Sequence, residues 1–163
     1  MDKKKLNLGQ INSQIINFLN LIGPGRPITE LTPVFLKGVC DSIDKTINWL
    51  RLAAQNVKSF DLGLSLSLML MATNYDVIKS LLNNVQKRLE RTNVNYGLIN
   101  LDEMDEIYMQ LNEIQNSAQA LFEKCKEFVI REGFAIEFEC QHNSEIDEYI
   151  KKNNLNSEKS VSK

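Results

Sequence analysis

Histidine is almost missing from this sequence, since His142 is the only one among 163 residues. It lies in a polar stretch near Asp147 and Glu148, which is typical of a solvated loop side chain. The sequence also lacks a phosphate-binding loop, a GxSxG turn, a cluster of cysteines and histidines, and the Glu-x-x-His pairs that a di-iron bundle requires. These absences exclude the common catalytic and metal-binding arrangements. We therefore expect no enzymatic activity, no cofactor, no metal site and no small-molecule substrate.

The sequence also has few cysteines and no excess of basic residues. Cys40, Cys125 and Cys140 are an odd number at wide spacings, which fits neither a disulfide framework nor a CxxC metal site. The net charge of -2 and the pI near 5.5 provide no basic excess for a phosphate backbone. No signal-type apolar run follows Lys3–Lys5. We expect a cytoplasmic protein that does not bind nucleic acid.

The sequence does contain a spacing of apolar residues that alternates between three and four in four segments. In the cleanest case it runs without a skip from Met104 to Phe128. Such a spacing keeps one stripe of an α-helix facing its partners. It predicts an all-α fold, which we interpret as an up-down-up-down four-helix bundle with long third and fourth helices and a short C-terminal extension. We expect one domain over residues 1–152 and a disordered tail over 153–163.

Residue types that begin and end helices delimit the four segments. Thr32 is a suitable N-cap before Pro33, Asp61 can cap the third helix, and Asn100 or Asp102 can cap the fourth. Gly133 can end the fourth helix in the left-handed conformation. The predicted helices cover about 6–22, 32–58, 62–91 and 102–132. Beyond them, 134–140 is expected to form a short extended segment or an irregular return, and 144–152 a short amphipathic helix.

The segment Leu62 to Ala72 is apolar almost all round, whereas a bundle helix needs only one apolar stripe. Its leucines alternate with other residues, as in a half-buried strand, but the three-four stripe continues through Leu64 and Leu68 and favours a helix. Eleven residues are too few for a bilayer span, which needs about 20. Three interpretations remain: a segment covered by the N-terminal helix and the C-terminal extension, a surface for a partner or second copy, or a membrane-inserting hairpin tip.

Trp49 lies one residue before the stripe residue Leu50. It belongs either to the edge of the core or to a contact surface, because tryptophan anchors are enriched at interfaces. We expect partner binding at Trp49, Leu66, Met69 and Leu70. The leading hypothesis is a non-enzymatic protein-protein interaction module that acts through helical surfaces on another protein or on itself as a homodimer.

A short run around Trp49 carries one family resemblance. Asn48-Trp49-Leu50-Arg51 is similar to the Asn-Trp-Gly-Arg core of the Bcl-2 homology 1 motif, and Leu52 and Ala54 are similar to the apolar positions after it. The likeness departs from the motif at Leu50, which stands where that family has glycine. With the leucine-rich segment it supports an alternative function, a membrane-active helical bundle that is toxin-like or a Bcl-2-like regulator.

Overall fold

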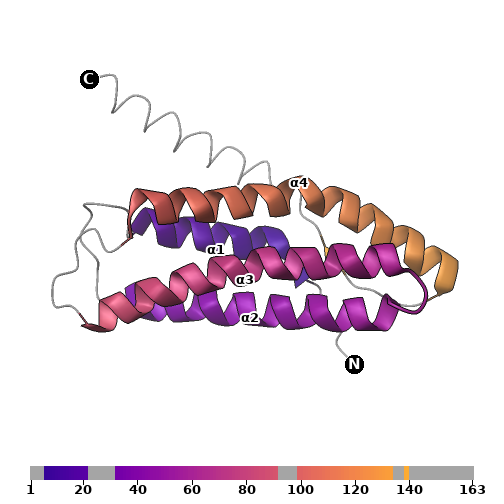
Figure 1. The fold of residues 1–163 in the computed structure, drawn as a ribbon, viewed down its shortest axis with the longest axis horizontal. Coiled ribbons are helices and arrows are strands. Elements are labelled where there is room, and N and C mark those ends of the chain that lie inside the picture. The colour runs from indigo at the N-terminus through magenta and orange to yellow at the C-terminus, as the bar shows by residue number, and fades with distance from the viewer. Residues whose placement is uncertain (1–5, 22–31, 92–98, 134–137, 140–163) are drawn as a thin grey trace, which may run out of the picture.

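A computed structural model describes residues 6–21, 32–91, 99–133 and 138–139 of the chain. Its elements in chain order are β1 (Leu6–Asn7), α1 (Leu8–Leu21), α2 (Thr32–Val57), α3 (Leu62–Arg91), α4 (Leu101–Glu132) and β2 (Phe138–Glu139). The four helices lie alongside one another and alternate in direction (Figure 1). The predicted all-α four-helix bundle is confirmed, as are its long third and fourth helices.

The predicted caps of α3 and α4 are present. The Asp61 carboxylate accepts a hydrogen bond from the Leu64 amide at 3.0 Å, and the Asn100 side chain accepts one from the Glu103 amide at 2.8 Å. Gly133 has φ 73° and ψ 10°, the left-handed conformation that glycine adopts without a steric penalty. Side-chain chemistry next to each helix therefore sets these ends.

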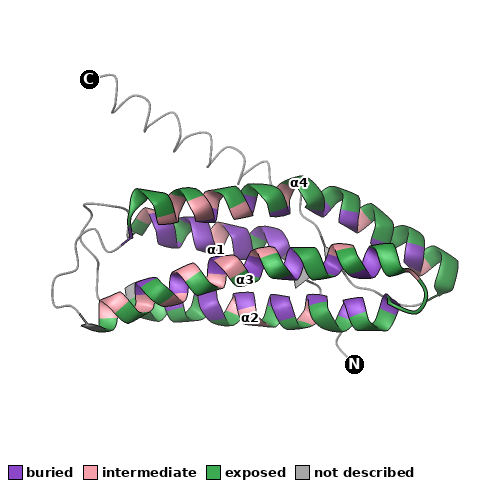
Figure 2. Cartoon of the chain, viewed as in Figure 1, coloured by how far each residue is buried: buried purple, intermediate pink, exposed green. Residues whose placement is uncertain are grey.

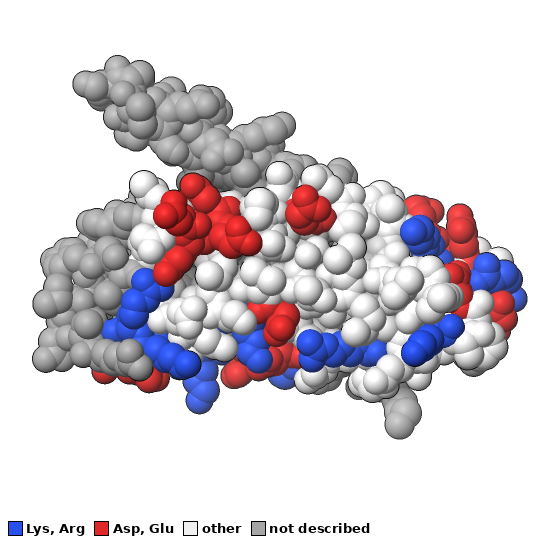
Figure 3. Space-filling model, in the orientation of Figure 1, with Lys and Arg blue, Asp and Glu red and all other residues white. Residues whose placement is uncertain are grey.

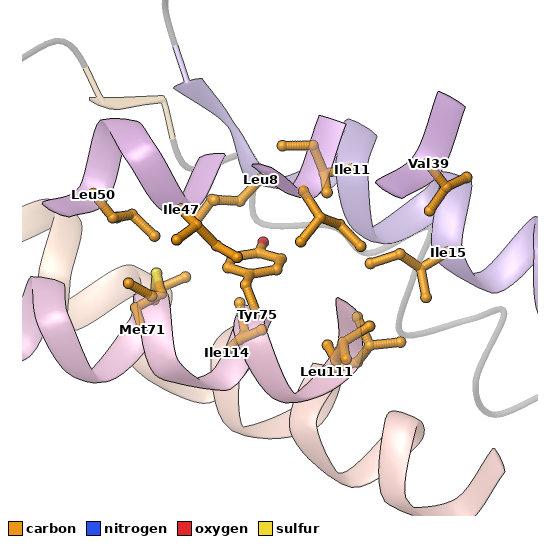
Figure 4. Packing of buried hydrophobic residues seen from close by; sticks show 14 of the residues in the cluster. Leu8, Ile11, Ile15, Val39, Ile47, Leu50, Met71, Tyr75, Leu111 and Ile114 are labelled. Carbon is orange, nitrogen blue, oxygen red and sulfur yellow. The ribbon is translucent and has the colours of Figure 1, made fainter. Parts of the chain in front are cut away.

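Each helix turns one apolar stripe inward, so the core runs along the whole bundle (Figure 2). Among the described residues, Tyr75 of α3 has the largest fully buried side chain. Figure 4 shows its ring among side chains from the other three helices, namely Leu8, Ile11, Ile15, Val39, Ile47, Leu50, Leu111 and Ile114. The Tyr75 hydroxyl donates a hydrogen bond to Asn12 Oδ1 at 3.0 Å, so the phenol is buried with its polar atom satisfied.

The helices α2 and α3 form the most closely packed pair. Small side chains stand at their contact, where the buried Ser65 hydroxyl donates to the carbonyl oxygen of Ala54 at 2.8 Å. Lys79 and Asp44 form an ion pair further along the same pair of helices. Because α3 also packs on α4, it lies between two neighbours and shows solvent only one face.

The first helix is much shorter than the others. With 14 residues against 32 in α4, it is about 21 Å long and α4 about 48 Å, at 1.5 Å per residue. Figure 1 shows the α2–α3 turn and the end of α4 extending beyond the start of α1. That end of the bundle is therefore built from α2, α3 and α4.

Several helix boundaries differ from the sequence prediction by one or two residues, including the start of α4 at Leu101 rather than Asp102. Leu6 and Asn7 were predicted to be helical, but they pair in parallel with Phe138 and Glu139. This pairing joins residues far apart in the chain, so a local pattern does not reveal it; it confirms an extended stretch within the predicted 134–140 segment. The second helix ends at Val57, whose carbonyl accepts from the amides of Phe60 and Asp61 in the turn. The predicted helix at 144–152 and tail at 153–163 lie outside the described residues.

Candidate functional site: an apolar surface on α3

The first half of α3 is apolar on two opposite faces and has no charged residue between Asp61 and Asp76. Its inner face is buried and consists of Leu64, Leu68, Met71, Ala72 and Tyr75. Its outer face carries four large apolar side chains in solvent, with exposed fractions of 57% for Leu62, 61% for Leu66, 41% for Met69 and 63% for Leu70. We call these four residues the α3 outer patch.

Helix geometry explains how one alternating run of leucines forms two faces. Successive residues rotate by about 100° around a helix, so Leu66 points away from Leu64 and Leu68. The segment is helical, and the strand-like alternation divides its leucines between core and solvent. The inner face is buried and the outer patch is exposed. The predicted cover by the C-terminal extension falls mostly outside the described residues and stays a prediction.

The start of α3, next to the outer patch, is held by contacts with the end of α4. Arg131 forms an ion pair with Asp61 at 3.2 Å, and the rings of Phe60 and Phe128 meet edge to face at 6.3 Å between centroids. The Leu64 amide and Arg131 hold the pKa of Asp61 below its ordinary value. The outer patch therefore lies at the start of a helix that is capped by Asp61 and held against the end of α4.

Trp49 lies on a different part of the molecule. It is half-buried and packs against the core from α2. Phe35, two heptads earlier on the same face of α2, stacks on Phe18 of α1 at 6.4 Å, so this face of α2 is turned toward α1. Of the four predicted partner-binding residues, the structure brings together Leu66, Met69 and Leu70 and leaves Trp49 outside the outer patch.

Leu62 belongs to the outer patch and was not among the predicted partner-binding residues. It stands four residues before Leu66 and eight before Leu70, which is the spacing of one helix face. That signal was present in the sequence. Once the buried positions identify the inner face, the spacing assigns Leu62 to the outer one.

Charged side chains of the described helices lie on the outside of the bundle. Figure 3 shows acidic side chains gathered over the first part of α4, and the surface over much of the right-hand half of α3 without charge. Arg88 donates from one nitrogen to both carboxylate oxygens of Glu103 at 2.6 Å, which links α3 to α4. Within the described ranges, no three His, Cys, Asp or Glu side chains are grouped so as to hold a metal ion.

The two described cysteines are buried and unpaired. Burial raises the pKa of Cys125 to about 12, and burial together with the Asp44 carboxylate raises that of Cys40 to about 11. A thiol that stays protonated at neutral pH is a poor nucleophile. His142 and Cys140 lie outside the described residues.

Two further findings bear on function. None of the described helices has both the length and the apolarity that crossing a bilayer requires. The chain matches no protein-family model, and no curated protein or solved structure is significantly similar to it. In the run Asn48–Arg51, which is similar to the Bcl-2 homology 1 motif, Leu50 is fully buried in the core.

Proposed function

We propose that this protein is a non-enzymatic protein-protein interaction module that binds through the α3 outer patch, in the simplest case to a second copy of itself. The observation that carries this proposal is the second apolar face of α3, at Leu62, Leu66, Met69 and Leu70. Contact with a partner removes such side chains from water, at roughly 25 cal/mol per Å² of apolar surface. Contiguous exposed apolar surface commonly marks an interaction site.

The chemistry of the described residues supports binding rather than catalysis. Both described thiols have raised pKa values through burial, and the described carboxylates that stand near cations form structural ion pairs such as Arg88–Glu103. Unpaired Cys40 and Cys125 also fit a reducing compartment, and on this ground we propose a cytoplasmic location.

Size-exclusion chromatography with light scattering tests the proposal on three proteins. The wild type is expected to form a dimer and Leu66→Asp a folded monomer, because a charge buried in an apolar interface opposes association while an exposed one is solvated. Met109→Asp is the matched control, since Met109 is 52% exposed on α4 and lies outside the outer patch. It should behave as the wild type.

The same variants separate the proposal from the membrane-active alternative. A Leu66→Asp protein with the wild-type mass, or one that has lost its helical circular dichroism, would overturn the proposal. Liposome leakage caused by the wild type and lost in Leu66→Asp would instead favour a membrane-inserting hairpin. We expect no leakage from any of the three proteins.

A further inference from the structure

We draw no further inference here: the strongest candidate, the exposed apolar face at the start of α3 formed by Leu62, Leu66, Met69 and Leu70, belongs to the site already described, and nothing in the part of the chain that the structure describes shows what covers it.

Discussion

Tyr75 and Asn12 share a hydrogen bond of 3.0 Å inside the core, 63 positions apart in the chain. It joins the middle of α3 to α1, and both side chains are buried. A buried amide oxygen without a donor costs about 1–3 kcal/mol, so the pair favours the one register of α1 in which the two side chains meet. The hydrogen bond thereby fixes the position of the short α1 along the longer α3.

Replacing Tyr75 with phenylalanine tests this role. The ring still fills its site while Asn12 Oδ1 loses this donor, so the free energy of unfolding should fall by about 1–3 kcal/mol. The double variant Tyr75→Phe with Asn12→Leu should recover part of the loss, because neither polar group remains. Urea denaturation followed by circular dichroism measures both values. Asn12→Leu alone completes the cycle, and a double variant whose loss equals the sum of the two single losses would show that the two side chains are not coupled.

The inner stripe should respond strongly to truncation. Leu82 and Leu111 are buried on facing helices, and replacing either with alanine should lower the free energy of unfolding by about 2–5 kcal/mol. Met109→Ala, two residues from Leu111 and exposed, should change it by less than about 0.5 kcal/mol. A loss at Met109 as large as that at Leu111 would contradict the assignment of the inner face.

Thiol reactivity should report burial of the cysteines. Because the pKa of Cys40 is raised to about 11 and that of Cys125 to about 12, both stay protonated at neutral pH. In a Cys140→Ser protein, we expect a thiol reagent to label neither of them quickly until denaturant is added. Immediate labelling of the folded protein would mean that these thiols reach solvent.

The same raised pKa values make stability fall at alkaline pH. In the unfolded chain a thiol ionises near its ordinary pKa of 9.0, whereas in the folded protein it ionises near 11 or 12. The contribution of the two buried thiols to the free energy of unfolding is therefore complete below pH 9. It is lost as the pH rises toward the thiol pKa values of the folded protein. The free energy of unfolding should decline between these limits, and Cys125→Ala should show a shallower decline than the wild type.

Asp61 should affect the free energy of unfolding at acid pH, whereas the thiols affect it at alkaline pH. Its pKa is lowered, first by the Leu64 amide and then by Arg131, so its contribution is present above the unfolded value of 3.8 and disappears as the pH falls through the lower folded value. Asp61→Ala should cost about 0.5–2 kcal/mol at neutral pH through loss of the cap. Asp61→Asn keeps an acceptor and should lose less. Urea titrations at neutral and acid pH distinguish the three proteins.

The helices could be predicted because local chemistry specifies them. The Asp61 and Asn100 caps and the stripe from Ile107 to Phe128 each depend on residues within a few positions of one another. The Asn12–Tyr75 bond and the pairing of Leu6 with Phe138 join distant positions. A single sequence carries no local signal for either contact.

The candidate site was predictable in part for the same reason. An excess of apolar residues at Leu62 to Ala72 indicated a second surface, and Leu66, Met69 and Leu70 lie on it. The pattern could not tell which apolar face turns inward, because α2 and α4 decide that. It also grouped Trp49 with these residues, although Trp49 lies on α2 at the edge of the core.

The α3 outer patch should act as a contact surface between copies, and the concentration dependence of unfolding measures this directly. If folded copies associate through the patch, the urea midpoint of the wild type should rise across a roughly hundred-fold increase in protein concentration. The midpoint of Leu66→Asp should stay constant and match that of the dilute wild type. A wild-type midpoint that is the same at every concentration, or a Leu66→Asp protein far less stable than the dilute wild type, would contradict the central claim.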